Sequence, residues 1–168
     1  MQDQVDFILD QWAKERPDLD ASVMGVVGRV SRLAKYIDQS LSENFAQHQL
    51  NRWEFDVLAT LLRSGPPYQL TPKVLLETLM LSSGAMTNRL DRLEDGGYIE
   101  RCPHPTDRRG VYIKLTDQGF EKINNAIEAH VEHEHHLLDS LTSEEKEQLA
   151  QLLRKILLSF GDENQTVN

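Results

Sequence analysis

Six residues between positions 82 and 92 have the types and spacing expected of a helix that reads base edges. They are Ser82, Ser83, Gly84, Thr87, Asn88 and Arg92. On a helix from residue 83 to residue 95, the apolar Met86, Leu90 and Leu93 share one face, so this polar set lies on the other side. Asparagine pairs well with adenine, and the free N–H groups of a helix N-terminus bind phosphate. The helix by itself is equally compatible with an ordinary solvated polar face.

A second candidate contact is the run Asp107-Arg108-Arg109 in the segment PHPTDRRG. The two prolines of this segment exclude a helix and favour a loop. An arginine held out by a nearby aspartate can enter a narrow minor groove, where negative potential is concentrated. A solvated turn is the alternative, but the order of helix, hairpin and basic tip favours contact with DNA.

The elements that would position these residues form a helix-turn-helix followed by a hairpin. Thr71-Pro72 begins a short helix that extends to about residue 79, and Ser82-Ser83 begins a second that ends before Gly96-Gly97. The hydrophobic period then changes to two, which predicts strands over 98–102 and 111–115. The predicted fold is mainly α with a small β-hairpin, a winged helix-turn-helix.

Further helices are predicted on both sides of this unit, over residues 5–13, 22–45 and 52–62 and after Thr116 and Thr142. The last one begins with the capping box T-S-E-E. The helix over 22–45 carries a long apolar stripe, formed by Val23, Val26, Val27, Val30, Leu33, Ile37 and Leu41. We expect all 168 residues to form one domain.

Charge and composition restrict the class of protein. The net charge is −9, but residues 51–114 carry nine basic and eight acidic side chains, so the acidic excess lies outside the predicted DNA-binding segment. A single cysteine, no apolar run near ~20 residues and no secretory signal predict a cytoplasmic protein without a membrane span. Phosphate-loop, metalloprotease and serine-hydrolase motifs are absent from the sequence, which predicts that the protein is not an enzyme.

The stretches SSGAMTNRLDRLEDGGYIER and DRRGVYIKLTDQG resemble the multiple-antibiotic-resistance regulator (MarR) family. The resemblance covers nearly the whole chain. It implies a homodimeric repressor, with dimerisation helices in 1–50 and 117–160 and a DNA-binding lobe in 51–116. Two recognition helices would then enter successive major grooves of a pseudo-palindrome, ~34–36 Å apart.

Three charged residues break the local pattern and suggest a ligand site. Asp56 interrupts the apolar run FDVLATLL, Arg89 leans toward the core side of the recognition helix, and Arg101 begins the wing. A buried charge costs several kcal/mol unless it is paired, and Asp56 and Arg89 could simply satisfy each other. Trp12 has a similar alternative, as the anchor that docks the first helix.

The stretches DQWAKERPDLD, EFDVLATLLRSGPPY and TNRLDRLE are similar to the urate-responsive, PecS-like branch of the MarR family. The resemblance implies that Trp12, Asp56, Arg89 and Arg101 bind the effector, and that no metal or other cofactor is needed. A planar, oxygen-rich purine anion such as urate or xanthine suits an aromatic face, a guanidinium fork and a carboxylate acceptor. Because Arg89 lies on the recognition helix, we expect the ligand to weaken DNA binding.

Other signals remain as alternatives for the same DNA-binding protein. The histidine-rich run from His130 to His136 could bind a metal or respond to pH, although a solvated helix face explains it as well. Cys102 follows Arg101, which could lower the pKa of its thiol and allow oxidation sensing.

Overall fold

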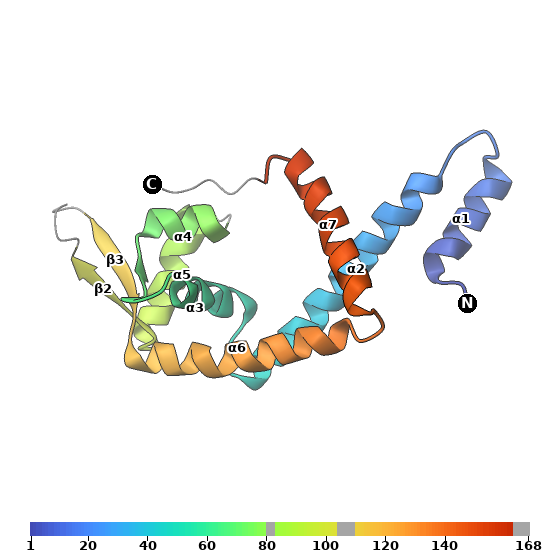
Figure 1. Cartoon of the computed structure of the whole chain (residues 1–168). Coiled ribbons are helices and arrows are strands. Elements are labelled where there is room, and N and C mark those ends of the chain that lie inside the picture. Colours follow the sequence, from blue (N-terminus) through green and yellow to red (C-terminus); the bar gives the residue numbers. More distant parts are fainter. Residues whose placement is uncertain (80–82, 104–109, 163–168) are drawn as a thin grey trace. The chain divides into compact units, whose positions relative to one another are not determined.

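The computed structural model of the chain describes residues 1–79, 83–103 and 110–162. Its elements are α1 (Gln4–Glu15), α2 (Ser22–Gln47), α3 (Arg52–Arg63), β1 (Gln69–Leu70), α4 (Pro72–Leu79), α5 (Ser83–Asp95), β2 (Ile99–Pro103), β3 (Val111–Leu115), α6 (Asp117–Leu137) and α7 (Ser143–Ser159) (Figure 1). The chain divides into two compact units, residues 1–43 and 44–168. Over the described residues, we find no helix that is long and apolar enough to cross a membrane.

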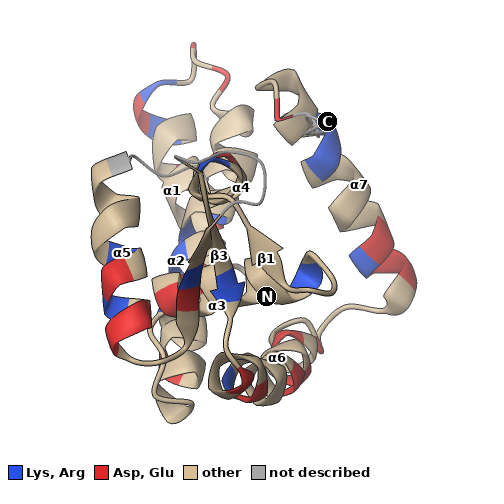
Figure 2. Ribbon diagram, turned by 90° about the vertical axis from the view of Figure 1, so that its left-hand side faces the viewer, with Lys and Arg blue, Asp and Glu red and all other residues tan. Residues whose placement is uncertain are grey.

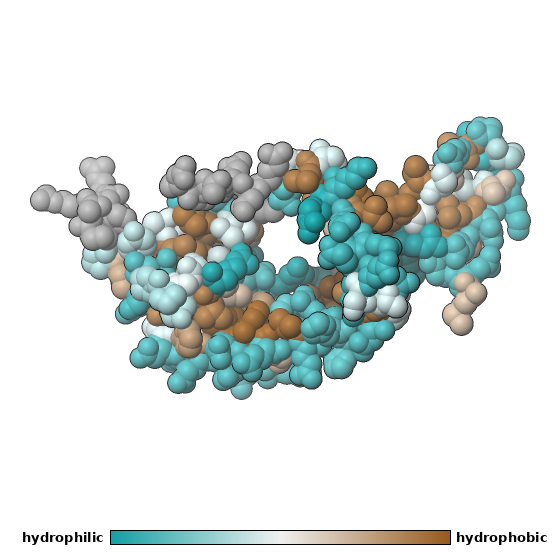
Figure 3. Space-filling view, viewed as in Figure 1, coloured by the Kyte–Doolittle hydropathy of each residue, from teal (hydrophilic) through white to brown (hydrophobic). Residues whose placement is uncertain are grey.

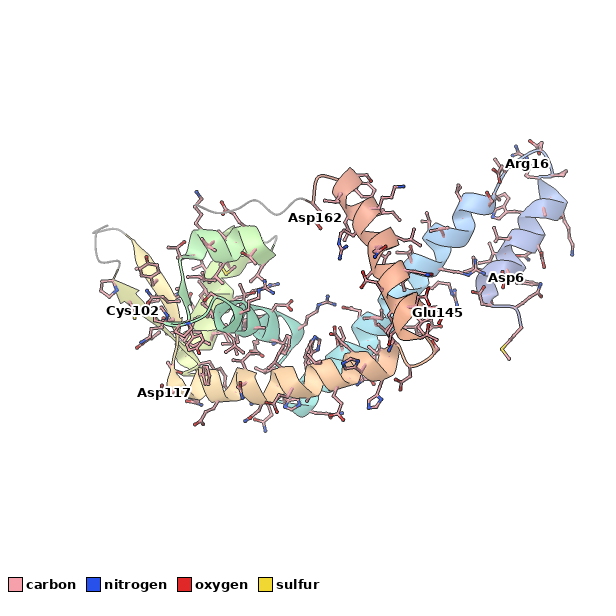
Figure 4. The ribbon with its side chains drawn as sticks, viewed as in Figure 1. Asp6, Arg16, Cys102, Asp117, Glu145 and Asp162 are labelled. Atoms are coloured by element: carbon pink, nitrogen blue, oxygen red, sulfur yellow. The ribbon has the colours of Figure 1, made fainter. Side chains whose placement is uncertain are left out.

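In the first unit, α1 packs against the N-terminal half of α2. The guanidinium of Arg29 on α2 binds both Asp3, at 2.8 Å, and Asp6, at 2.6 Å; Asp6 is labelled in Figure 4. Asp3 and Asp6 also form the capping box that begins α1. Gly28 of α2 faces the buried side chain of Val5 on α1, and a Cβ built on it would lie in ordinary van der Waals contact with Val5, at 3.4 Å. Short-range packing and charge pairing thus hold this helical hairpin together.

The second unit contains a lobe in which α3, α4 and α5 pack with a small sheet against the first half of α6 (Figure 1). The sheet is antiparallel with the strand order β1-β3-β2. The core of the lobe is apolar and almost fully buried; it includes Val57, Leu58, Leu61, Leu75, Met86, Leu90, Leu93, Ile99, Ile113, Leu115, Ile123 and Ala126. This core is complete within the single chain.

The structure confirms the predicted fold class, mainly helical with a small sheet. The predicted strand over 98–102 is displaced by one residue, to Ile99–Pro103, while Val111–Leu115 is as predicted. The sequence prediction missed β1, whose two residues pair with Lys114 and Ile113 of β3. A two-residue strand is too short to show a period of two, which is why the sequence did not predict it. The hairpin is therefore part of a three-stranded sheet in which β3 is the central strand.

Thr116 and Gly119 join the lobe's sheet to α6. The Thr116 hydroxyl accepts a hydrogen bond from the Gly119 N–H at 3.0 Å, which caps α6, and donates one to the Gly97 carbonyl at 2.6 Å. A Cβ on Gly119 would overlap the carbonyl oxygen of Tyr98. The L-T-x-x-G part of the sequence therefore has a structural cause: a cap at the threonine and a close backbone approach at the glycine.

Two helices keep apolar stripes exposed. Five residues of the predicted α2 stripe, four residues of α7 and the α7 C-cap residue are each at least 37% exposed: Val23, Val26, Val27, Val30 and Leu33, with Leu152, Leu153, Ile156, Leu157 and Phe160. Figure 3 shows the brown, hydrophobic surface along α2. Such contiguous apolar surface is characteristic of an interaction site.

Candidate nucleic-acid interface

The two faces of α5 are arranged as the sequence predicts. Met86, Leu90 and Leu93 are buried in the lobe, at 1–3% exposure, which fixes the rotation of the helix about its axis. The opposite side is exposed and carries the predicted set Gly84, Thr87, Asn88 and Arg92. Among the described atoms outside its chain neighbours and the backbone of α5, none lies within 4 Å of a Cβ built on Gly84. This open face of small and hydrogen-bonding residues is suited to approach base edges.

Four of the predicted DNA contacts, Ser82 and the tip Asp107-Arg108-Arg109, lie outside the described residues. Ser83 is the first residue of α5, as predicted, but its side chain is not among those described. These five contacts therefore stay predictions. The described strands β2 and β3 lead directly into and out of the segment that contains the tip.

Arg101 lies at the seam between wing and recognition helix, where the sequence places it. Its guanidinium Nη2 contacts Asp91 Oδ1 at 2.6 Å, Nη1 binds Glu94, and its backbone N–H donates to Glu94 Oε1 at 3.1 Å. Partial burial opposes its charge, but the bond to Asp91 and the charge of Glu94 outweigh this and raise the pKa of Arg101. Sequence reasoning missed these two carboxylates, although their i, i+3 spacing in NRLDRLED places them on one helix face.

Asp56 lines a pocket of about 420 Å³ in the lobe, together with Phe55, Thr60, Arg63 and His130. The expectation of a buried charge is wrong, because the Asp56 side chain is 46% exposed. Its ion-pair partner is Arg52, one helical turn earlier, at 4.0 Å. Partial burial raises the pKa of Asp56, and the charges of Arg52 and then Arg89 offset part of this effect.

Arg89 connects the recognition helix to the neighbourhood of this pocket. Its guanidinium carbon lies 5.6 Å from the ring centroid of Trp53 on α3, a cation–π geometry. Its charge offsets part of the rise in the pKa of Asp56, but the ion-pair partner of Asp56 is Arg52 and not Arg89. Sequence reasoning missed Trp53, because the local pattern does not distinguish an aromatic residue that packs in the core from one that forms a cation–π contact.

Trp12, the fourth predicted ligand residue, lies near the end of α1 and is 38% exposed. It belongs to the first unit, whereas Asp56, Arg89 and Arg101 belong to the second. Its participation in a common site therefore stays a prediction.

The histidine run begins with a residue that has a packing role. The His130 ring packs against the stacked rings of Phe45 and Phe55, with centroids 5.3 and 4.6 Å away, and its side chain is 13% exposed. His130 Nε2 lies 3.3 Å from Glu134, one turn along α6. Within residues 1–79, 83–103 and 110–162, no group of three or more His, Cys, Asp or Glu side chains is placed to hold a metal ion.

Cys102 lies on β2, as labelled in Figure 4. Its partial burial and then the nearby charge of Glu100 raise the pKa of the thiol. The expectation that Arg101 lowers this pKa is wrong, because the Arg101 charge is directed to Asp91 and Glu94. A raised pKa disfavours the reactive thiolate form.

Helix α5 buries one face in the lobe and exposes a polar face, and a small antiparallel wing follows it. This arrangement defines a winged helix-turn-helix DNA-binding protein. The sequence model of the MarR family matches residues 48–110, which span most of this lobe. The chain is 44% identical to the HTH-type transcriptional regulator PecS of Dickeya dadantii (strain 3937), over 91% of this chain and 92% of PecS. The protein belongs to the MarR family of transcriptional regulators, which are not enzymes.

Solved structures agree with this assignment. A crystal structure of a mutant MarR from E. coli in complex with operator DNA superposes with a TM-score of 0.70 at 28% identity, covering 87% of this chain and 97% of that chain. AbsC from Streptomyces coelicolor, at 18% identity, shares the fold with a TM-score of 0.78 over 86% of this chain and 98% of its own. The protein is thus a DNA-binding regulator with the fold of these relatives.

Proposed function

We propose that the protein is a homodimeric repressor that binds a pseudo-palindromic operator and is released by a planar purine anion such as urate or xanthine. Its similarity to PecS over nine-tenths of both chains supports a place in that branch of the family. The reading helix, the wing strands and the pocket lined mainly by α3 support this proposal.

The exposed apolar stripes of α2 and α7 support the dimer. A monomer that left both stripes in water would expose large aliphatic side chains along the first half of α2 and the second half of α7. Burial of apolar surface contributes about 25 cal/mol per Å² removed from water. A second copy of the chain, which carries the same stripes, is the partner that buries them symmetrically.

The electrostatic coupling between Asp56 and Arg89 carries the effector proposal. Asp56 lines the pocket on α3, while Arg89 lies on the helix that reads DNA. Partial burial raises the pKa of Asp56, and the charges of Arg52 and then Arg89 offset part of this rise. The pocket also contains Arg63, a donor for ligand oxygens, and the Phe55 ring, an apolar surface. A ligand N–H group that binds the carboxylate, or a ligand oxygen that binds Arg89, would change the forces on α5.

Arg101 takes part in this proposal only if the ligand draws it away from Asp91 and Glu94. Such an exchange would give the ligand different affinities for the DNA-bound and free states. Only that difference can shift the equilibrium, and a 100-fold loss of DNA affinity corresponds to about 2.7 kcal/mol.

The experiment is a titration of urate, with xanthine in parallel, into the complex of the protein with a duplex that it selects from a random-sequence library. We expect release in the wild type and a blunted response in Asp56→Asn. Glu121→Gln, which removes the same charge from an exposed position on α6, serves as the control and should respond normally. Retention of the complex at millimolar concentrations of both purines would contradict the effector, while leaving DNA binding intact.

A further inference from the structure

We propose that Arg101 is a positioning residue for DNA recognition, which fixes the wing strand β2 to the reading helix α5 through Asp91 and Glu94. This inference depends on the DNA-binding class of the protein and not on the purine effector. It assigns Arg101 a function in the ligand-free protein.

The contacts join two elements that must act as one body. Asp91 and Glu94 lie one turn apart on α5, and the Arg101 guanidinium binds both, with 2.6 Å between Nη2 and Asp91 Oδ1. Glu94 also accepts the backbone N–H of Arg101 at 3.1 Å, so its carboxylate binds the strand itself. A guanidinium that binds two carboxylates presents its donors in a fixed plane, which restricts both the distance and the rotation between helix and strand.

The same contacts change the charge that DNA meets. With a period of 3.6 residues, Asp91 falls on the side of α5 that carries Gly84, Thr87 and Asn88. Figure 2 shows acidic and basic residues together on α5. A carboxylate at this position would repel phosphate, and the Arg101 guanidinium bound to it offsets that charge.

These ion pairs are too exposed to matter much for folding. The side chains of Arg101, Asp91 and Glu94 are 31%, 56% and 36% exposed, and exposed pairs contribute little to protein stability. The core of the lobe is complete without them. Their effect should therefore be seen in DNA recognition, which requires the helix and the wing to be placed together, and hardly in the melting temperature.

The test compares affinity for a duplex selected by the wild-type protein with affinity for random-sequence DNA. We expect Arg101→Gln to weaken selected-site binding about tenfold or more, and random-sequence binding less than about threefold. Lys114→Gln is the matched control, because Lys114 binds Glu100 at 3.1 Å and joins β2 to β3 without contacting α5. This control removes the same charge and should weaken both kinds of DNA binding by similar small factors.

A second variant keeps the test independent of the folding of the first. Glu94→Gln removes a negative charge, so non-specific affinity should rise, while loss of the contact to Arg101 should lower affinity for the selected site. The charge exchange Glu94→Arg with Arg101→Glu should recover part of the loss seen in Arg101→Gln. The opposite changes expected in Glu94→Gln, a higher non-specific affinity and a lower selected-site affinity, distinguish a positioning role from a simple change of charge.

Three results would overturn the inference. One is an equal loss of selected and random binding in Arg101→Gln, with a decrease of about one in the salt-dependence slope, which indicates a direct phosphate contact. Another is a rise of both affinities in Glu94→Gln. The third is unchanged selected-site affinity in Arg101→Gln.

Discussion

Similar aliphatic side chains are buried in one region of the molecule and exposed in another. They are buried in the lobe around α3 and α5, and they are exposed on the stripes of α2 and α7. In the lobe, Leu58, Leu61 and Leu75 are completely buried within one chain. On α2, Val23 and Val27 are 65% and 64% exposed. The lobe can therefore form its core alone, whereas the stripes have a physical reason to exist only when another surface covers them.

This difference predicts that substitutions in the two regions act on different equilibria. Changes in the lobe core should alter the free energy of unfolding. Changes on the stripes should alter association, and DNA affinity through it, because two linked reading helices bind a two-part site more tightly than one.

The largest effect is expected for Val27→Asp on the α2 stripe. Burial of a carboxylate costs several kcal/mol after relaxation, and in a symmetric dimer the change occurs twice. We expect a monomer in light scattering and at least a tenfold loss of operator affinity. Gln39→Glu, which adds the same charge on the opposite side of α2, should remain a dimer; dissociation of both variants would argue against a stripe-specific interface.

Next in size is Leu58→Ala in the lobe core. Removal of this completely buried side chain should lower the free energy of unfolding by 2–5 kcal/mol, a roughly estimated range for leucine truncation. Chemical denaturation measures this effect. A change below about 1 kcal/mol would mean that the core of the lobe is less tightly packed than the structure indicates.

A smaller loss is expected for Gly119→Ala, where the added Cβ would overlap the Tyr98 carbonyl. Overpacking of this kind costs roughly 1–3 kcal/mol. Gly84→Ala is the matched substitution on the open face of α5, where the Cβ meets no described neighbour within 4 Å beyond its own helix, and it should leave the stability unchanged or slightly higher. Equal melting temperatures for the two variants would contradict the close approach at Gly119.

The smallest effect is expected for Asp56→Asn, and it should depend on pH. Partial burial raises the folded-state pKa of Asp56 above 3.8, the ordinary value. The stability that this raised pKa contributes is present below pH 3.8 and is lost as the pH rises through the folded-state value. Asp56→Asn should therefore become more stable than the wild type as the pH rises toward neutrality, in melts from pH 3.5 to 7; an advantage confined to acid would show the opposite sign.

The helices and the hairpin could be predicted because their signals are local. The proline after Thr71, the T-S-E-E box at Thr142 and the change of period after Gly97 each determine a boundary within a few residues. The buried face of α5 followed from the spacing of Met86, Leu90 and Leu93, which the structure confirms.

The contacts of the charged residues could not be predicted in the same way. The sequence predicts a buried Asp56 within reach of Arg89, but the side chain is half-exposed beside Arg52. Arg101 was expected to face a ligand, and it binds Asp91 and Glu94 in the structure. A long polar side chain has several possible partners within reach. Which of them it binds depends on tertiary distances, which the periodicity of the sequence does not encode.

The hydroxyl of Thr116 has a consequence for protein engineering. It binds the carbonyl of Gly97, behind the reading helix, and the N–H of Gly119, at the start of α6. A chimera that exchanges the reading helix and wing of two relatives should therefore be joined after Gly119. The transplanted segment then contains the threonine and both of its hydrogen-bond partners. A junction placed between β3 and Thr116 would take the turn at Gly97 from one protein and the hydroxyl group that binds its carbonyl from the other.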